Sequence, residues 1–380
     1  MRLGDICSKI GSGATPRGGK EAYSTSGIPI IRSQNVLDWS FSSNGLAYLN
    51  DEQAKTLSNV EVHQGDILLN ITGDSVARAC IVPSDVIPAR VNQHVAILRP
   101  KEKANATFIL AWLQTNKDLL LKLASSGATR NALTKRMLEG LDINLPSIDI
   151  QNHIAELISL IQSKINLNIK LNGYLLELAT TRFEQALFKS NRVVRLGDIV
   201  KLEDSKRVPL NSRDRDARKG PYPYYGATSI MDYVDDHLFD GIRVLLGEDG
   251  SVIDESGRPI LQYVWGKYWV NNHAHILAAA SDYSLEAIYI ALQRTPISHI
   301  VTGAVQRKIS QRNLNKLKLE MPDAKSLEYL QDIFAAYRCN CEENRGLVSL
   351  RDALLPKLMS GEIDVSKIDV AQLNSHLAEY

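Results

Sequence analysis

The chain repeats itself at long range, and this repeat constrains its architecture more than any other feature. Three pairs of segments mark the repeat: Arg2–Ile6 with Arg195–Ile199, Val91–Leu98 with Val270–Leu277, and Gly127–Thr134 with Gly303–Ser310. The first pair is identical, with the sequence Arg-Leu-Gly-Asp-Ile, and the other pairs share a pattern. Because the period is close to half the chain, the repeat predicts two whole globular domains of similar fold about a pseudo-two-fold axis, and not a solenoid of short units.

Each copy reaches a proline, Pro146 or Pro322, and then continues into a long segment with helical spacing. Steps that alternate between four and three residues land mostly on apolar side chains, which is typical of a coiled-coil seam. The seam positions are Ile154, Ile158, Ile161, Ile165, Asn168, Asn172, Leu175, Ala179, Arg182 and Ala186 in the first segment, and Leu327, Leu330, Phe334, Tyr337, Cys341, Asn344, Val348, Arg351, Leu355 and Leu358 in the second.

We predict that the two helices pack on each other; the alternative is that each packs on its own domain. Asn168, Asn172 and Asn344 fall on the seam, where a polar residue penalises wrong alignments and so fixes the register. Each helix would span roughly 50 Å, and Pro356 predicts that the second one ends or kinks there. A shorter amphipathic helix is predicted over Ala106–Leu123. Short apolar runs between Gly, Pro, Asn and Ser predict strands elsewhere, so the expected class is mixed α+β.

Composition limits the functions that the chain can have. A length of 380 residues suits two or three domains, and 44% hydrophobic with 23% charged residues is usual for a soluble globular protein. No apolar run approaches the roughly 20 residues of a membrane helix, and no signal-peptide core is present, so a cytoplasmic location is expected. A net charge of +1 argues against a non-specific nucleic-acid coat, so any DNA binding must use local patches. The four cysteines form no Cys-x-x-Cys pair, so no zinc site is expected.

Motifs for intrinsic catalysis are missing from the sequence. Gly13–Lys20 is glycine-rich like a phosphate-binding loop, but Glu21 stands where that motif needs Ser or Thr, and no helical pattern follows. Neither a Gly-x-Gly-x-x-Gly motif opening a helix nor the Asn/Asp-Pro-Pro-aromatic tetrapeptide of amino-methyltransferases occurs. Glu203–Lys206 is the nearest approach to the carboxylate–lysine cluster of a nuclease, but it lacks an upstream Pro-Asp pair. We therefore expect no catalytic residue, metal or cofactor on this chain.

Side chains suited to DNA are spread over both copies, in loops that differ between the copies. In the major groove Arg and Lys pair with guanine, and Asn and Gln with adenine, while basic loop residues can also hold phosphates. The candidate DNA contacts are Arg17, Lys20, Arg32, Gln34, Asn35, Asn92 and Gln93 in the first copy, and Lys206, Arg207, Arg213, Arg215, Arg218, Lys219, Asn272, Gln306, Arg307 and Lys308 in the second. For any single residue, a solvated surface side chain is the alternative. His94 and His273 occupy matching positions, which suits either a framework or a site role.

The order of the motifs, found twice over nearly the whole chain, resembles the specificity subunit of a type I restriction–modification system. The motifs are Leu3–Ile6 followed by Gly11–Pro16, Val91–His94 leading to Leu98–Pro100, Gly127–Arg130 leading to Leu145–Pro146, Tyr224–Ala227, Gly247–Gly250 and Leu358–Ile363. The resemblance adds Thr129 and Arg130 to the candidate DNA contacts. The second copy departs from it, because Gly303–Gln306 lacks the usual Thr-Arg pair.

The resemblance implies two target-recognition domains joined by an antiparallel pair of helices. Each domain would read one half of an interrupted DNA sequence from the major groove, and the helices would set the spacer; half-sites one helical turn apart lie about 34 Å apart. Two methyltransferase subunits would dock on this chain, and restriction subunits would bind through them. S-adenosylmethionine, ATP and Mg would be held by those partners, and the target adenine would flip into a partner pocket.

The expected boundaries follow from the repeat and the helical segments. They are 1–149 for the first recognition domain, 150–190 for the first long helix, 191–324 for the second domain, 325–360 for the second long helix and 361–380 for a C-terminal tail. Two other interpretations stay open: a specificity subunit that serves a fused methyltransferase–nuclease, and a coiled-coil protein adaptor. A self-sufficient nuclease or methyltransferase is disfavoured by the missing motifs.

Overall fold

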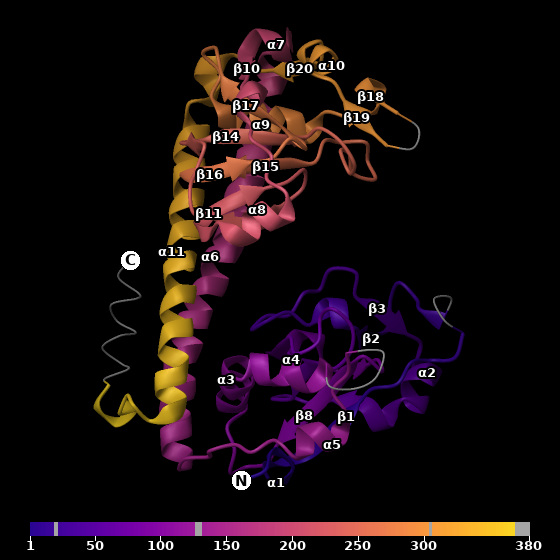
Figure 1. Cartoon of the computed structure of the whole chain (residues 1–380). Coiled ribbons are helices and arrows are strands. Elements are labelled where there is room, and N and C mark those ends of the chain that lie inside the picture. The colour runs from indigo at the N-terminus through magenta and orange to yellow at the C-terminus, as the bar shows by residue number, and fades with distance from the viewer. Residues whose placement is uncertain (19–21, 126–130, 304–305, 369–380) are drawn as a thin grey trace. The chain divides into compact units, whose positions relative to one another are not determined.

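The structure, a computed structural model, describes residues 1–18, 22–125, 131–303 and 306–368 (Figure 1). The chain divides into two compact units. Unit 1 comprises Met1–Asn168 with Glu342–Tyr380, and unit 2 comprises Ile169–Cys341, so both long helices contribute to both units. None of the helices in the described ranges combines the length and the apolar character needed to cross a membrane.

Unit 1 contains two four-stranded sheets. The first is antiparallel, in the order β1 (Cys7–Ser12), β8 (Val95–Pro100), β5 (Ile67–Asn70), β6 (Ala79–Ile81). The second has the order β3 (Ala47–Leu49), β2 (Ile28–Ile31), β7 (Ala89–Val91), β4 (Glu61–Val62), and its central pair β2–β7 is parallel.

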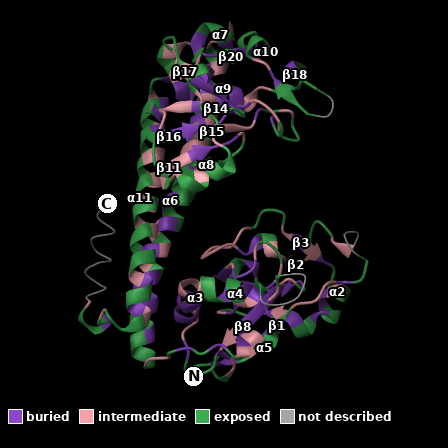
Figure 2. Ribbon diagram, viewed as in Figure 1, coloured by how far each residue is buried: buried purple, intermediate pink, exposed green. Residues whose placement is uncertain are grey.

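The first sheet of unit 1 is buried on both faces (Figure 2). Successive side chains of a strand point to opposite faces. Accordingly, Leu69 and Leu98 belong to one hydrophobic cluster, while Leu68 and Ile97 belong to another. Burial on both faces explains why β5 and β8 appear in the sequence as continuous apolar runs and not as an alternating pattern.

The helices of unit 1 cover the first of these clusters and the edges of the second sheet. They are α1 (Leu3–Ile6), α2 (Asp51–Thr56), α3 (Ala106–Thr115), α4 (Lys117–Ser125) and α5 (Lys135–Glu139), with 3-10 helices at Ser33–Asn35, Ser58–Val60, Ser84–Val86 and Val365–Lys367. The prediction of one helix over Ala106–Leu123 was wrong. Asn116 leaves the helical conformation and its side chain donates to the carbonyl of Trp112 at 2.8 Å, which ends α3 before α4 begins.

Unit 2 repeats both sheets in the same strand order. Its antiparallel sheet runs β10 (Val200–Leu202), β17 (Ala274–Ala279), β14 (Arg243–Gly247), β15 (Leu261–Val264). Its second sheet runs β12 (Ile230–Val234), β11 (Lys219–Tyr225), β16 (Lys267–Val270), β13 (Phe239–Asp240), again with a parallel central pair, β11–β16. Each strand from β1 to β8 therefore has a counterpart nine places later, which confirms the predicted internal repeat.

Two two-stranded antiparallel sheets and several helices complete unit 2. The pairs are β9 (Arg192–Arg195) with β20 (Lys318–Met321), and β18 (Val301–Thr302) with β19 (Lys308–Ile309). The helices are α7 (Leu196–Ile199), α8 (Ser212–Ala217), α9 (Leu285–Arg294) and α10 (Gln311–Asn315), with 3-10 helices at Asp204–Lys206, Ser298–Ile300 and Ala324–Leu327.

The repeated sequence segments have the same local roles in both units. The two Leu-Gly-Asp-Ile segments form α1 and α7, each of which buries its leucine and isoleucine. Thr134 and Ser310 are the N-caps of α5 and α10, and each side-chain oxygen accepts a hydrogen bond at 3.2 Å from the backbone N–H three residues on. The motif is therefore repeated because the same helix begins at the same place in each unit.

The long helices α6 (Ile148–Lys189) and α11 (Tyr329–Ser360) pack on each other within each unit. In unit 1, Asn168 donates to Glu343 at 2.7 Å and to Asn344 at 2.9 Å. In unit 2, Asn172 donates to the carbonyl of Tyr337 at 3.3 Å. Residue numbers rise along one helix as they fall along the other, so the pair is antiparallel, and the predicted seam is confirmed.

Helix α6 exceeds the roughly 50 Å expected for each long helix, and α11 does not end at Pro356. The 42 residues of α6 span roughly 63 Å at 1.5 Å per residue. Helix α11 continues through Pro356 to Ser360, because Leu355 and Leu358 are buried in the core of unit 1 on either side of the proline. The gain from burying these two leucines outweighs the backbone hydrogen bond that Pro356 cannot make.

Candidate nucleic-acid interface

Each unit has a tight turn that leads from its parallel strand pair into the central antiparallel strand. The turns are residues 92–94, between β7 and β8, and residues 271–273, between β16 and β17. Asn92 and Asn271 are buried, and the side-chain oxygen of each accepts a hydrogen bond from the backbone N–H two residues on, at 3.0 and 2.8 Å. The predicted DNA contact by Asn92 therefore does not fit the structure, because this side chain holds the turn together.

The middle residue of each turn is exposed. Gln93 lies with its side-chain nitrogen 3.4 Å from Nε2 of His94. Asn272 accepts a hydrogen bond from Arg207 through its backbone carbonyl, at 3.3 Å, and its side chain is accessible. Both predicted residues can thus be reached by a ligand in this conformation.

The histidine that ends each turn binds a residue at the same place in the neighbouring strand connection. Nδ1 of His94 lies 2.6 Å from the hydroxyl of Thr72, which follows β5. Nδ1 of His273 lies 2.6 Å from the carboxylate of Asp249, which follows β14. The geometry is shared, but a neutral hydroxyl in one unit is replaced by a carboxylate in the other. Equivalent positions in the two units therefore present different chemistry.

Asn35, predicted as a base-reading residue, is fully buried in unit 1. Its amide nitrogen donates to the carbonyls of Ser42 and Asn44 at 2.9 and 3.1 Å, and its oxygen accepts from the N–H of Arg32 at 3.0 Å. The prediction of a DNA contact is corrected accordingly. Asn35 shapes the loop that follows β2, because both amide hydrogens and the side-chain oxygen bond within the loop.

The other predicted contacts of unit 1 are more accessible. The guanidinium of Arg32 lies over the ring of Tyr23 at 5.5 Å and donates to the carbonyl of Gly45. Gln34 is exposed and donates to the same carbonyl at 3.1 Å, and Arg17 is exposed in the turn after β1. The predicted contacts Lys20, Thr129 and Arg130 lie outside the described residues.

A cavity of about 830 Å³ opens in unit 1 beside Gln34. Its walls come from the connection between β5 and β6, from the loop after β2 and from the turn before β8. They include Gln34, Thr72, Asp74, Arg78, His94 and Asn131. Sequence reasoning did not select Asp74 or Arg78, because neither belongs to a repeated segment or to a cluster of like charge. His94, by contrast, was marked by its recurrence in the second copy.

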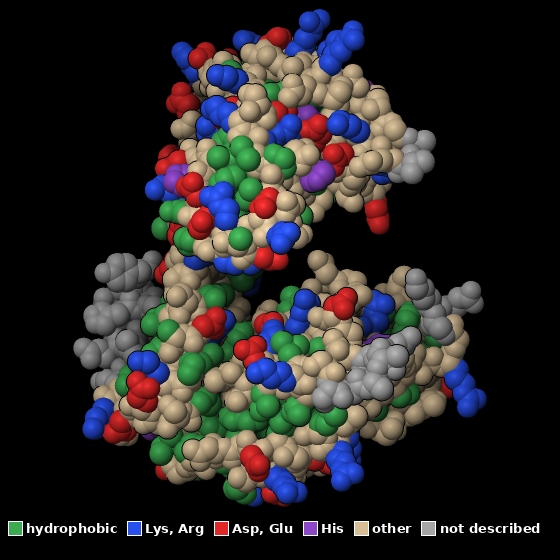
Figure 3. All heavy atoms as spheres, viewed as in Figure 1, with side chains coloured by type: hydrophobic (Ala, Val, Ile, Leu, Met, Phe, Trp, Pro, Cys, Tyr) green, Lys and Arg blue, Asp and Glu red, His purple; other side chains and the backbone are tan. Residues whose placement is uncertain are grey.

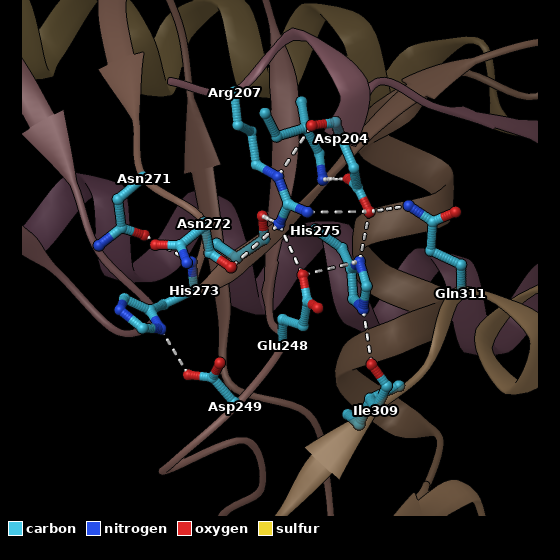
Figure 4. A network of polar contacts seen from close by, with 12 residues as sticks. Asp204, Arg207, Glu248, Asp249, Asn271, Asn272, His273, His275, Ile309 and Gln311 are labelled. Carbon is cyan, nitrogen blue, oxygen red and sulfur yellow. Dashed lines mark hydrogen bonds and ion pairs between the residues drawn. The ribbon is translucent and has the colours of Figure 1, made fainter. Parts of the chain in front are cut away.

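Unit 2 buries a network of charges around Asp204 (Figure 4). The Asp204 carboxylate accepts hydrogen bonds from Nδ1 of His275 and from Gln311, both at 2.6 Å. Arg207 donates to Glu248 at 2.6 Å. Asp204, Glu248 and His275 are residue types that could hold a metal, and their ligand atoms lie within 4.8 Å of one another. Nε2 of His275 faces the carbonyl of Ile309 at 2.8 Å, however, so both ring nitrogens face oxygen acceptors. In this arrangement the cluster is an ion-pair network.

The network keeps its carboxylates ionised. Burial by itself would raise the pKa of Asp204, but hydrogen bonds from His275 and the backbone N–H of Ile276, with the charges of His275 and Arg207, lower it below its ordinary value. Burial likewise opposes ionisation of Glu248, and the Arg207 hydrogen bond with nearby positive charge again lowers the pKa. The network therefore favours the folded state above the acidic range.

Several predicted contacts of unit 2 take part in this network. Arg207 is mostly buried and also donates to the carbonyls of Asn272 and Ala274, so its predicted role as a DNA contact does not fit the structure. Lys206 pairs with Glu203 at 2.6 Å and Lys308 with Glu248 at 3.2 Å, and both lysines stay more than half exposed. Gln306 and Arg307 are exposed, and the Arg307 carbonyl accepts the N–H of Gly250.

The basic cluster of residues 213–219 is largely neutralised by aspartates. Arg215 and Lys219 pair with Asp232 at 3.2 and 2.7 Å, and Arg218 pairs with Asp235 at 2.9 Å. Figure 3 shows Lys/Arg and Asp/Glu side chains interspersed over this part of unit 2. Arg213 is exposed on α8 and makes no ion pair with another described residue. A phosphate that binds Arg215, Arg218 or Lys219 must therefore compete with an aspartate.

The duplicated sheets, with matched turns and different exposed side chains, define a two-domain recognition protein. A family model described as the type I restriction modification DNA specificity domain matches residues 1–175 and 189–337, which include both sheets of both units. The chain therefore belongs to this family. It is a specificity subunit of a type I restriction–modification system, a non-catalytic subunit that recognises DNA.

Individual relatives agree with this assignment. A putative type I restriction enzyme specificity subunit of Haemophilus influenzae is 29% identical over 127 residues, which cover 33% of this chain and 32% of that relative. The type I restriction enzyme MjaIX specificity subunit of Methanocaldococcus jannaschii is 23% identical over 97% of this chain and 94% of its own. The crystal structure of the S subunit of a type I restriction–modification system from M. genitalium shares the fold, with a TM-score of 0.56 at 15% identity over 94% of this chain and 95% of that one.

Proposed function

We propose that this specificity subunit directs its assembly to an interrupted DNA sequence, and that each unit reads one half of it. The observation that carries the proposal is that one strand order occurs in both units while the side chains at equivalent points differ. Thr72 beside His94 in unit 1 corresponds to Asp249 beside His273 in unit 2. Two domains with the same strand order but different hydrogen-bond donors and acceptors suit two different half-sites.

The helix pair suits a spacer between the half-sites. Helix α6 is continuous over 42 residues, roughly 63 Å, which exceeds the roughly 34 Å between half-sites one DNA turn apart. The buried Asn168 and Asn172 bind α11 at defined positions, which opposes sliding of one helix along the other. We expect insertion or removal of whole heptads in both helices to change the spacer and leave both half-sites unchanged.

Helix α6 also has an apolar stripe that is not covered within unit 2. Leu171, Tyr174 and Leu178 are 42–55% exposed and recur at steps of three and four residues. None of them is a seam position, unlike the neighbouring Asn172. We propose that this stripe binds a methyltransferase subunit, and that restriction subunits bind through the methyltransferases. The partners would hold S-adenosylmethionine, ATP and Mg and would receive the flipped target adenine.

The test of the proposed function is single-molecule methylation sequencing of DNA from cells that carry this chain with its co-encoded partners, compared with cells in which the chain is deleted. We expect methyl-adenine at one interrupted motif to disappear on deletion. Exchange of residues 194–321 for the second domain of another family member should change one half-site only. A methylome that is unchanged by deletion in an expressing, assembled complex would contradict the proposal, and half-sites that both change on exchange would contradict its modular form.

The proposed binding of a methyltransferase to the apolar stripe on α6 has a separate test. Leu171→Asp with Tyr174→Asp should abolish co-purification of the methyltransferase subunits without loss of the folded chain. Val193→Asp is the matched control, since Val193 is 64% exposed but lies on β9, off the stripe. Equal recovery of the methyltransferase with both variants would place the docking surface elsewhere.

A further inference from the structure

Arg78 differs from the other arginines that are at least half buried. Among the described residues eleven arginines are buried or half-buried, and ten of these bind a carboxylate, a backbone carbonyl or an aromatic ring. Arg78 makes no hydrogen bond or ion pair through its guanidinium with any of the described side chains or carbonyls. A guanidinium carries five N–H donors, and partial burial removes some of their water. Arg78 is thus a donor group without an acceptor among the described residues, at the wall of the unit 1 cavity.

The cavity also contains an acceptor of the opposite charge. Asp74 lies on its wall four residues before Arg78, is exposed, and forms no ion pair with Arg78. Gln34 and Asn131 add neutral donors and acceptors. A carboxylate on the same wall repels a phosphate group, which accepts hydrogen bonds only. A base-pair edge in the major groove, in contrast, presents donors and acceptors side by side, and so suits this mixture.

The backbone holds Arg78 in a defined direction. Ala77, directly before it, is buried and has φ of +68°, a conformation that side-chain-bearing residues rarely adopt. The N–H of Ala77 donates to the carbonyl of Asn70 at 2.9 Å, and the N–H of Asn70 donates to the carbonyl of Arg78 at 2.8 Å. Such strain persists where the surrounding structure over-determines the backbone, and it is concentrated at ligand sites.

We propose that Arg78 and Asp74 read one G·C base pair of the first half-site. Arg78 donates to O6 and N7 of the guanine, and Asp74 accepts from N4 of the cytosine. This assignment rests on the proposed function of unit 1 as a DNA reader. In the matched connection of unit 2, Asp249 replaces Thr72, and the longer loop to β15 at Leu261 carries Asp254 and Arg258 with the same four-residue spacing. There the Asp254 carboxylate accepts the backbone N–H groups of Ser256 and Arg258, both at 2.8 Å, so it is used within its own loop. The proposal for Asp74 and Arg78 concerns the half-site of unit 1.

The test uses the complete complex with its co-encoded partners. The interrupted motif is first read from the methylome of the wild type. The affinity of the purified complex is then measured for duplexes that carry each of the four base pairs at every position of the motif. With Arg78→Ala, we expect the preference for G·C at one position of one half-site to fall about 5- to 150-fold, the equivalent of 1–3 kcal/mol per bidentate contact. With Arg78→Lys we expect a smaller fall at the same position. Asp74→Asn should relax the preference at the same position, and the other half-site should keep its specificity.

The lysine variant separates base reading from phosphate binding. A phosphate contact survives in Arg78→Lys, which keeps the charge, whereas lysine lacks the planar fork of arginine and pairs with guanine less well. Normal base preferences in Arg78→Lys, with uniformly weaker binding by Arg78→Ala, would overturn the proposal in favour of a phosphate contact. Unchanged preferences in both variants would also overturn it. Arg136→Ala is the control, since Arg136 is exposed on α5 and does not line the cavity. Failure of the proposed function is distinguishable, because the wild-type complex would then yield no interrupted motif.

Discussion

Nδ1 of His273 lies 2.6 Å from a carboxylate oxygen of Asp249, in the place that His94 and Thr72 occupy in unit 1 at the same distance. An ionised carboxylate only accepts, so Nδ1 of His273 is the donor in this contact. The threonine hydroxyl can donate or accept, so it does not fix the ring of His94 in this way. One backbone frame thus supports two histidines with different hydrogen-bonding properties.

Exchanging the partner of the histidine should alter recognition in one half-site. We expect Asp249→Thr, which gives unit 2 the pair found in unit 1, to change the base preference of the second half-site and to leave the first intact. Methylation sequencing of the complex with this variant measures both halves in the same sample. Asp282→Thr is a suitable control, since Asp282 is exposed in the loop before α9. A motif identical to that of the wild type would show that the pair is framework only.

The aspartates around the basic cluster of unit 2 should suppress non-specific binding. Asp232 pairs with both Lys219 and Arg215, and its hydrogen bond to Lys219 lowers the pKa of the Asp232 carboxyl. In Asp232→Asn, Arg215 loses its carboxylate partner and Lys219 keeps only its ion pair with Asp216 at 3.2 Å. We expect tighter binding to DNA of unrelated sequence. In a plot of the logarithm of the DNA association constant against the logarithm of the salt concentration, the slope should be steeper by about 1. An unchanged slope would mean that this cluster does not approach the DNA backbone.

The sequence predicted the features that produce a periodic or repeated pattern of residues. The antiparallel seam could be read from alternating steps of four and three residues, since burial of one helix face imposes that spacing. Partners distant in the sequence were not predictable. Nothing near Arg215 in the chain indicates that Asp232 will neutralise it, and nothing near Asn35 indicates that its amide is used by Ser42 and Asn44. Arg78 was missed for a related reason, because a missing partner is visible only once the fold brings the possible partners together.

Unit 2 should be sensitive to acid through its buried network. The pKa values of Asp204 and Glu248 are lowered by folding, so their contribution to stability is complete above the ordinary values of 3.8 and 4.5. That contribution is lost as the pH falls through and below these values.

The substitution Asp204→Asn should lower the free energy of unfolding by about 3–5 kcal/mol near neutral pH, because it leaves a buried cation without its partner. It should also reduce the further loss on acidification. Hydrogen exchange of β14 and β17 between pH 6 and pH 3 measures both effects, with the exposed Asp85→Asn as a control; equal pH dependence in the wild type and Asp204→Asn would contradict the assignment.

Gly13 should tolerate no side chain, whereas Gly11 in the same Gly-Ser-Gly segment should. A Cβ on Gly13 would lie 1.9 Å from the carbonyl oxygen of Val91, and a Cβ on Gly11 would meet nothing within 4 Å. The N–H of Ala14 donates to that same carbonyl at 3.0 Å, so the clash would displace the link between β1 and the end of β7. We expect Gly13→Ala to destabilise unit 1 by about 1–3 kcal/mol. Hydrogen exchange of β7 and β8 is the measurement, and a Gly13→Ala variant as stable as Gly11→Ala would refute the close approach.

The buried asparagine of the unit 1 seam should fix the alignment of the two helices. Asn168 is 2% exposed and donates to both Glu343 and Asn344, whose own amide donates to the carbonyl of Ile165 at 3.3 Å. Asn168→Leu should lower the free energy of unfolding by about 1–3 kcal/mol, because the oxygens on α11 lose their donor in a partly buried seam. The double change Asn168→Leu with Asn344→Leu replaces both asparagines, and Glu343 keeps its ion pair with Lys164 at 3.5 Å. It should therefore recover most of that loss, and the double-mutant cycle should show strong coupling. If the seam fixes the spacer, the same double variant should methylate sites with more than one spacer length. A single spacer in a stable double variant would show that the apolar seam positions fix the register without the asparagines.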